Sequence, residues 1–216
     1  MFIDESLWIK SNLSQLYLPP RSRILDIGSS TTDFRATQPH ITENVYRPLN
    51  ERGFDIIHFD ARPGDGIDIV GDIENPDIIE QIGEKFNLVL CANLLEHVSN
   101  VESTVGNVIN LVRKDGYLLL TAPNKYPRHD DPIDTMYRPS DRELQELASR
   151  HAAITIIASE ILDIRNHIYY FYESRYPFWG YRKFRFWRYY FNRFRWKQSC
   201  LLLRVHSQFD RCLEIR

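Results

Sequence analysis

The chain has 216 residues, of which 43% are apolar and 26% charged, so it can form a packed core of ordinary domain size. This composition excludes wholesale disorder, and nine glycines and eleven prolines without a fixed period exclude collagen-like and solenoid architectures. The longest apolar runs fall far short of the ~20 residues that cross a bilayer.

The first residues contain neither a basic region nor an apolar signal stretch, so we expect a cytoplasmic protein. Three cysteines without metal-ligand spacing fit a reducing compartment. The net charge of −2 conceals an asymmetry, because residues 1–163 hold 26 acidic and 15 basic residues, whereas residues 164–216 hold 3 acidic and 12 basic residues. The balance is therefore −11 in the body and +9 in the last quarter, which points to a separate role for that quarter.

Hydrophobic periodicity predicts strands that alternate with helices along the chain. The expected helices cover residues 4–18, 76–85, 101–112 and 139–150, with residues 33–52 helical in pieces. The expected strands cover residues 23–28, 55–60, 67–70, 86–92, 117–121, 153–158 and 199–205. Gly116 is expected to end the third helix, and Ser140 with Glu143 forms a capping box for the fourth. This alternation predicts an α/β fold with a mostly parallel sheet and helices on both faces.

In such sheets the ligand lies at the carboxyl ends of the strands, so the residues after each strand are the candidates for a site. The first loop contains Gly28, Ser29 and Ser30, and its glycine allows a tight turn beneath a ligand. A dinucleotide fold would have glycines where Ser30 and Asp33 stand, and the Asp33 carboxylate would repel a pyrophosphate. The loop therefore suits a ligand without phosphate, or is a plain strand-to-helix turn.

Two acids follow the second and third strands. Asp60 can accept two hydrogen bonds from the hydroxyls of a ribose, and it lies 32 residues after Gly28, against ~20 in dinucleotide binders. Asp72 can accept a bond from an adenine amino group while Ile73 packs on the ring. Taken singly, each acid is equally well explained as a surface or turn residue.

Together these pieces resemble the class I S-adenosylmethionine-dependent methyltransferases of the small-molecule branch. The resemblance is most specific in residues 86–98, which end in Leu-Glu-His-Val, and in residues 112–124, with Lys-Asp-Gly-Tyr at their centre. It covers residues 23–160 and implies a Rossmann-like, mostly parallel seven-stranded sheet with S-adenosyl-L-methionine as cofactor. No particular catalytic residue type is demanded, because the sulfonium is already an activated methyl donor and the acceptor must mainly be aligned with it.

The resemblance also implies a role for each matching residue. Gly28, Ser29 and Ser30 would hold the methionine part of the cofactor, with Asp26 near its ammonium group. The family usually has a second glycine where Ser30 stands, and the Ser30 hydroxyl could instead donate to the cofactor carboxylate. The remaining expected contacts are Asp60 to the ribose, Ala61, Asp72 and Ile73 to the adenine, and Asn93 to the methionine end.

After the fifth strand, residues 126–139 resemble a His…Pro-x-Asp…Tyr-Arg loop found in a subset of these enzymes. His129 is the candidate general base, with Asp130 or Asp131 as its orienting partner. The alternative is a structural loop in which Asp134 pairs with Arg138. His97 is expected to orient a helix start. Because His129 and its neighbouring acids offer one imidazole among clustered carboxylates, we expect solvated charge and no metal site there.

Residues 175–197 contain twelve aromatic and eight basic residues. They can form a helix whose aromatic stripe completes the core, a helix on an anionic membrane surface, or a nucleic-acid-binding segment. We favour the membrane over nucleic acid, because the acidic body would repel a polyanion and no nucleic-acid module is recognisable.

The sequence thus predicts a single methyltransferase domain over residues 1–216 that acts on a small molecule, such as a glycan or a lipid-linked intermediate. Its expected parts are an N-terminal helix in 1–20, a cofactor-binding core in 21–163, a basic and aromatic helical insert in 164–198, and the last strand and tail in 199–216. One alternative is a non-catalytic protein of the same fold that binds a partner or membrane through residues 175–197. Another is an NAD-dependent oxidoreductase, which the single-glycine loop disfavours.

Overall fold

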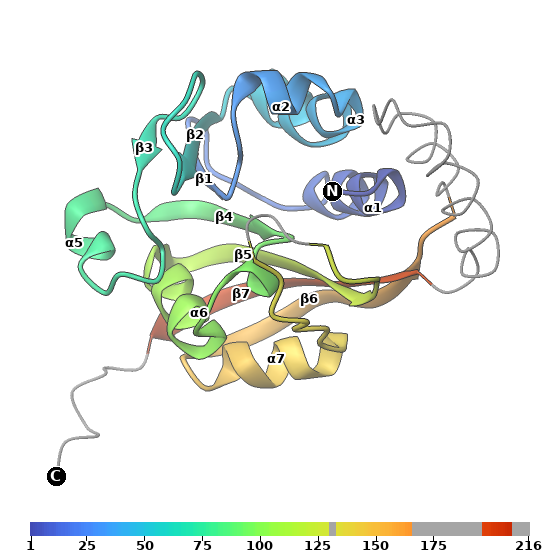
Figure 1. The fold of residues 1–216 in the computed structure, drawn as a ribbon. Coiled ribbons are helices and arrows are strands. Elements are labelled where there is room, and N and C mark those ends of the chain that lie inside the picture. The colour runs from blue at the N-terminus through green and yellow to red at the C-terminus, as the bar shows by residue number, and fades with distance from the viewer. Residues whose placement is uncertain (130–132, 166–195, 209–216) are drawn as a thin grey trace, which may run out of the picture.

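The computed structural model describes residues 1–129, 133–165 and 196–208, and within them it shows one seven-stranded sheet (Figure 1). The strand order is β3-β2-β1-β4-β5-β7-β6, with β7 antiparallel to both of its neighbours and the other pairs parallel. The strands are β1 (Arg23–Ile27), β2 (Asp55–Asp60), β3 (Ile69–Val70), β4 (Phe86–Ala92), β5 (Val112–Lys125), β6 (Ala152–Asp163) and β7 (Lys197–Gln208). The predicted α/β class and mostly parallel sheet are confirmed.

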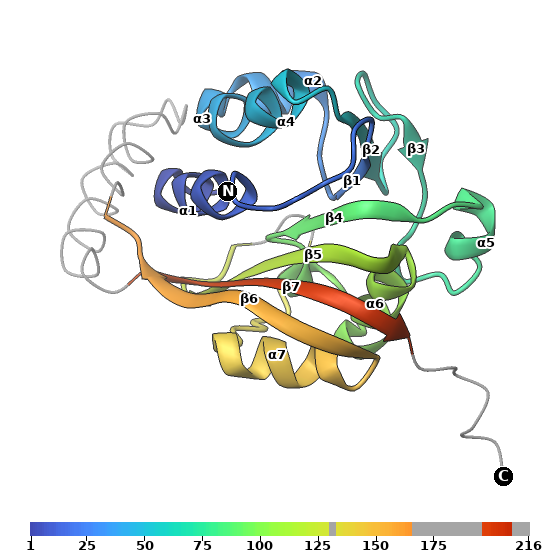
Figure 2. The same cartoon turned by 180° about the vertical axis from the view of Figure 1, so that it is seen from behind.

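Helices cover both faces of the sheet, as Figures 1 and 2 show from opposite sides. The helices are α1 (Ile3–Leu13), α2 (Thr32–Ala36), α3 (Pro39–Ile41), the π-helix η1 (Thr42–Tyr46), α4 (Arg47–Glu51), α5 (Ile78–Ile82), the 3-10 helix η2 (Leu95–His97), α6 (Val101–Asn110) and α7 (Asp141–Ser149). Helices α5, α6 and α7 lie on one face and α1 to α4 on the other. No helix in the described part of the chain is long and apolar enough to cross a membrane.

Two buried clusters hold these layers together. On one face, Val105 and Val108 of α6 and Leu144 and Leu147 of α7 belong to the larger cluster. On the other face the side chains of Ile9 and Leu13 in α1 share a second cluster with the η1–α4 segment and the sheet. The periodic apolar residues that predicted these helices are therefore the ones that cover the sheet.

The capping box of α7 is confirmed. Ser140 Oγ accepts from the Glu143 N–H, and Glu143 Oε2 accepts from the Ser140 N–H at 2.7 Å. Both bonds satisfy backbone N–H groups that have no acceptor within the helix, which explains why α7 begins at Asp141.

Several predicted boundaries were wrong. The third helix ends at Asn110 instead of residue 112, and Gly116 lies inside β5, whose register shifts against β4 between Phe86 and Leu88. Residues 113–116 of β5 have no partner in register on β4, and local periodicity does not reveal such an irregularity. The expected helix over residues 76–85 covers only Ile78–Ile82, while β6 and β7 are longer than predicted. Lys197 and Gln198, assigned to the insert, belong to β7, and most of residues 175–197 lie outside the described residues.

Gly116 has no room for a side chain, which gives a first prediction. A Cβ at this position would lie 2.9 Å from the carbonyl oxygen of Arg113 and 3.0 Å from that of Asn87, both backbone atoms that cannot swing away. Gly116→Ala should lower the free energy of unfolding by about 1–3 kcal/mol, as overpacking does elsewhere. Lys114→Ala, at an exposed position of the same strand, should stay within about 0.5 kcal/mol in the same urea titration. Equal stability of the two variants would contradict the tight packing at Gly116.

Candidate active site

The loop after β1 lies flat against the end of β2. Gly28 has φ +76°, and its N–H donates to the carbonyl of Phe59 at 2.9 Å, while the Ser29 N–H reaches the same oxygen at 3.2 Å. A Cβ on Gly28 would lie 3.3 Å from Cδ1 of Leu94, in the segment after β4. Both the left-handed backbone and the nearby leucine therefore favour glycine, and Gly28 itself is exposed at the end of β1.

Ser30 and Asp60 join the ends of β1 and β2. The Ser30 N–H donates to Asp60 Oδ2 at 2.9 Å, and the Arg62 N–H donates to Asp60 Oδ1 at 2.9 Å. Each carboxylate oxygen can still accept a further bond. Ser30 has φ +59°, in the left-handed region that glycine enters without cost, so the loop keeps the backbone shape of a second glycine. The Arg35 guanidinium donates to the Ser30 carbonyl and supports that shape.

Asp26 is placed beneath the loop. Its side chain is buried, with Oδ2 accepting from the Tyr46 hydroxyl at 2.6 Å and lying 3.5 Å from His58 Nδ1. Burial and the adjacent carboxylate raise the pKa of Tyr46 well above its ordinary value, so the phenol remains a donor to Asp26. Asp26 thereby ties β1 to the π-helix η1.

The turn that carries Asp72 and Ile73 is anchored to α6. Asn107 Nδ2 donates to the Ile73 carbonyl at 2.7 Å, and the Ile73 side chain belongs to the larger core cluster. Asp72 is exposed, and its Oδ1 accepts from the Glu74 N–H at 2.9 Å. Ala61 is exposed as well. Asp72 and Ala61 are thus accessible near the ends of β3 and β2, whereas Ile73 serves the core.

Sequence reasoning missed a buried carboxylate beside Asn93. Glu5 of α1 is fully buried and accepts from Asn93 Nδ2 at 2.9 Å, from the Thr121 hydroxyl at 2.6 Å and from the Phe2 N–H at 2.9 Å. Asn93 itself has φ +53°, and its Oδ1 accepts from Gln198 Nε2 at 2.8 Å. This network ties α1 to β5, to β7 and to the residue that follows β4.

The missed signal lay in the spacing of α1. Glu5 is four residues before Ile9, which is four residues before Leu13, so all three share the buried face of the helix. A carboxylate on an apolar stripe needs buried donors, and that requirement could have directed attention to Glu5.

Three titratable side chains meet between the loops after β4 and β5. Oε1 of Glu96 lies 3.7 Å from His97 Nε2 and 4.0 Å from His129 Nε2. The two imidazole rings are 5.0 Å apart, edge to face. The two loops are tied together because the Glu96 carbonyl accepts from both the N–H and the hydroxyl of Thr135. The structure therefore brings His129 next to the Glu-His pair, which the sequence did not predict.

The carboxylate next to Nδ1 of His129 is that of Asp134. His129 Nδ1 lies 3.1 Å from Asp134 Oδ2, off the line of a well-formed hydrogen bond, and the His129 N–H donates to the same oxygen. Asp134 also pairs with Arg138 at 2.6 Å, as the structural-loop interpretation expected. Asp130 and Asp131 lie outside the described residues.

Burial governs the protonation of this group. It raises the pKa of Glu96 to about 7, and burial together with the charge of His97 lowers the pKa of His129. Against the effect of burial, hydrogen bonds from Arg138 and from two backbone N–H groups hold the pKa of Asp134 well below its usual range. At neutral pH the site therefore combines a neutral His129 with an ionised Asp134 behind it.

Aromatic rings line the side of this group nearest α1. Tyr126 lies 5.0 Å from the His129 ring, 5.4 Å from Phe2 and 4.7 Å from Trp196, all edge to face. Trp196 is one of the last residues of the basic aromatic segment, so the end of that segment adjoins the candidate acceptor side. We call Phe2, Tyr126 and Trp196 the aromatic wall.

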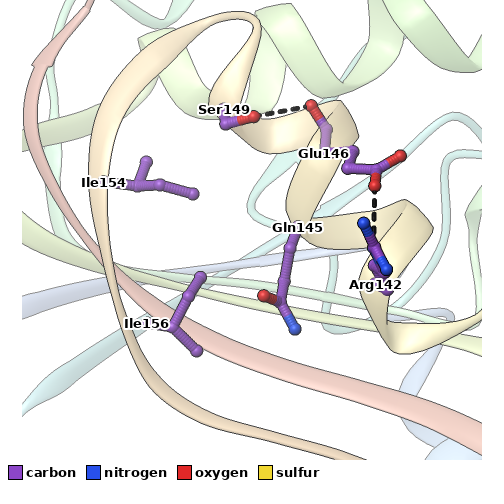
Figure 3. Close-up of a pocket in the computed structure, with 6 residues that line it drawn as sticks. All are labelled: Arg142, Gln145, Glu146, Ser149, Ile154 and Ile156. Atoms are coloured by element: carbon purple, nitrogen blue, oxygen red, sulfur yellow. Dashed lines mark hydrogen bonds and ion pairs between the residues drawn. The ribbon is translucent and has the colours of Figure 1, made fainter.

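A hollow elsewhere on the surface does not coincide with these residues. It has a volume of about 310 Å³ and opens between α7 and β6 (Figure 3). Its lining residues are Arg142, Gln145, Glu146, Ser149, Ile154 and Ile156. Figure 3 shows the Arg142–Glu146 ion pair at its rim and the two isoleucines projecting from β6. The hollow holds none of the predicted site residues.

Comparison with known families identifies the family to which this chain belongs. A family model described as a methyltransferase domain matches residues 6–199, most of the 216-residue chain. The chain belongs to the S-adenosylmethionine-dependent methyltransferase family. Its cofactor is therefore S-adenosyl-L-methionine, and the NAD-dependent alternative is set aside. No curated protein matches the sequence.

Solved structures with the same fold are distant in sequence. A protein assigned as a sarcosine dimethylglycine methyltransferase from Galdieria sulphuraria superposes with a TM-score of 0.63 at 13% identity, covering 94% of this chain and 85% of that chain. Phosphoethanolamine N-methyltransferase 2 from Haemonchus contortus, in complex with S-adenosyl-L-methionine, has a TM-score of 0.55 at 12% identity, with 95% and 53% coverage. The [4+2]-cyclase SpnF has a TM-score of 0.53 at 15% identity, with 94% and 81% coverage. Such likenesses establish the class I methyltransferase fold and no particular acceptor.

The left-handed backbone at Ser30 can be tested directly. Ser30→Val should lower the free energy of unfolding by about 1–2 kcal/mol, because a β-branched side chain is disfavoured at positive φ. Ser30→Gly should be more stable than Ser30→Val by at least that margin, and it should keep the N–H bond to Asp60. Guanidinium titrations of the two variants, followed by circular dichroism, measure the difference. Indistinguishable stabilities would show that Ser30 does not hold this conformation in solution.

Proposed function

We propose that this methyltransferase transfers a methyl group to an oxygen atom of a small-molecule acceptor bound between the loops after β4 and β5. The observation that carries the proposal is the position of Glu96, His97 and His129 next to the strand ends where the family binds its cofactor. When bound, S-adenosyl-L-methionine supplies a methyl group already activated by its sulfonium. The protein's task is to align the acceptor and to remove its proton.

The residues at the ends of β1 and β2 fit the cofactor. Gly28 leaves exposed backbone for the methionine part, Ser30 is half-buried beside it, and the buried Ser29 would support the loop from below. Asp60 is held by two backbone N–H groups and still has lone pairs for the ribose hydroxyls. Ala61 is exposed beside it, where an adenine ring can lie. These observations support the predicted binding residues, and they require no change in the backbone conformation of the structure.

The other proposed contacts have narrower roles. Asn93 would border the methionine end through its backbone, since both ends of its side-chain amide are already bonded to Glu5 and Gln198. Asp26 would act on the ammonium group from beneath the loop. Asp72 would reach the adenine rim from its exposed turn, and Ile73 would support that rim from the core.

His129 is proposed as the general base. With Nδ1 facing Asp134, its Nε2 is left to accept a proton from the acceptor hydroxyl, and its lowered pKa keeps it neutral and ready to do so. Asp134 holds the ring and stabilises its charge after the transfer. Asp131 remains a proposed second partner that lies outside the described residues.

The aromatic wall favours an acceptor with an apolar ring face, such as a glycan or a lipid-linked intermediate. Residues 175–197 would bring the chain to an anionic membrane surface, where arginines contact headgroups and aromatic rings enter the interface. Their end at Trp196, beside Tyr126, would place such a substrate next to His129.

Cofactor binding is tested by calorimetry. The chain should bind both S-adenosylmethionine and its demethylated product, and Asp60→Asn should weaken binding roughly 10- to 100-fold through loss of a charged acceptor for the ribose. Asp33→Asn, which removes an exposed acid from the adjacent helix α2, serves as the matched control and should bind normally. Absence of binding at millimolar ligand would favour the non-catalytic alternative.

Turnover is tested with methyl-labelled cofactor and a panel of small hydroxylated acceptors sorted by class. His129→Ala should reduce methyl transfer by about 10²–10⁴-fold while cofactor affinity stays unchanged, as expected for loss of a general base. His206→Ala, on the exposed part of β7, is the control. Unchanged transfer in the His129 variant would remove it from the mechanism.

A further inference from the structure

The group Glu96, His97 and His129 has the composition and spacing of a metal site. One oxygen of Glu96 and one ring nitrogen from each histidine lie within 4.8 Å of one another. Ligand atoms around a divalent ion are about 3 to 3.5 Å apart when each bond is about 2.0–2.2 Å long. A contraction of about 1 Å would therefore enclose an ion. We propose that these three residues bind a divalent first-row transition-metal ion.

The orientation of both histidines supports this proposal. Nδ1 of His97 faces the backbone carbonyl of Ile133 within hydrogen-bond distance, so it carries the proton and leaves the Nε2 lone pair toward Glu96. Nδ1 of His129 lies 3.1 Å from the Asp134 carboxylate, and its Nε2 also faces Glu96. His97 thus has the orientation of metal-binding histidines in proteins, in which the second ring nitrogen donates to a carbonyl or carboxylate. His129 Nδ1 lies beside a carboxylate but is not aligned with it as a hydrogen bond.

The carboxylate supplies an independent observation. The Glu96 side chain is only 1% exposed, and its Oε2 has no hydrogen-bond partner within the described ranges. A buried carboxylate oxygen without a donor is costly, and a cation bound beside it would remove that cost. The loops that carry the three ligands are already fixed to each other through the bonds between Thr135 and the Glu96 carbonyl.

The ligand set indicates the kind of ion. Two imidazoles and one carboxylate suit Mn²⁺, Fe²⁺ or Zn²⁺ better than Mg²⁺ or Ca²⁺, which prefer oxygen ligands. This site differs from the cluster weighed from the sequence, because Asp134 lies behind His129 instead of acting as a ligand. The sequence could not pair His97 with His129, since their contact depends on how the two loops fold together.

The role of the ion rests on the proposed function. The His129 side chain is 36% exposed and His97 14%, so an ion bound here would keep positions open toward solvent. A hydroxyl of the acceptor bound at such a position would be held beside the methyl donor and would lose its proton to water more readily. The ion would then replace His129 as the activating group, because both roles use the same Nε2 lone pair.

Direct binding tests the site without any activity assay. The untagged chain, freed of metal with a chelator, is titrated with Mn²⁺ and followed by electron paramagnetic resonance, with Zn²⁺ and Mg²⁺ titrated by calorimetry. We expect one Mn²⁺ per chain and weaker binding of Mg²⁺. Glu96→Gln and His129→Ala should each weaken Mn²⁺ binding at least 10-fold, and Asp134→Asn roughly 10- to 100-fold through the orientation of His129. His206→Ala, which removes an exposed histidine far from the site, should bind normally.

Folding and cofactor binding are checked on the same samples. Each variant must retain its circular dichroism spectrum and its affinity for S-adenosylmethionine before its metal affinity is compared. No saturable binding of Mn²⁺ or Zn²⁺ at millimolar concentration, or binding that Glu96→Gln and His129→Ala leave unchanged, would overturn the site. Failure of the cofactor to bind, by contrast, would overturn the proposed function and leave the metal result standing.

Discussion

The parallel pairing of β1 with both β2 and β4 is the constraint on which the rest of the molecule depends. It places the carboxyl ends of the three strands at one edge, at the point where strand order reverses. The Asp60 carboxylate then fixes the loop after β1 to the end of β2 by accepting from Ser30 and Arg62. Gly28, Ala61 and Asn93, which are assigned to the cofactor, lie in the loops that leave this edge.

The fold was largely readable from the sequence because alternation of apolar strands and amphipathic helices is a local signal. The capping box at Ser140 and the turn at Gly28 were predicted for the same reason, since each needs only neighbouring residues. The course of β5 through Gly116 was not predicted, because a strand irregularity is defined by the partner strand. The lengths of β6 and β7 likewise depend on their antiparallel pairing with each other.

The residues of the candidate site likewise fall into those that local sequence predicts and those that depend on distant contacts. Residues at or just after the end of a strand, such as Asp60 and Asn93, were predicted as site residues from their position. The contact of His129 with Glu96 and the burial of Glu5 were missed, because they join segments far apart in the chain. The structure also explains how a serine serves in this loop, since Ser30 adopts the left-handed backbone conformation that glycine enters most readily. Similar folds carry different reactions, so the acceptor has to be argued from the loops after β4 and β5.

The hydrogen bonds among Glu5, Asn93 and Gln198 join three separate parts of the chain. These residues come from the first helix, the middle of the sheet and the last strand. This part of the candidate site therefore forms only when the first helix and the last strand in the described part of the chain have both docked. Local fraying at either place would break these hydrogen bonds, so their integrity reports the cooperative folding of the whole domain.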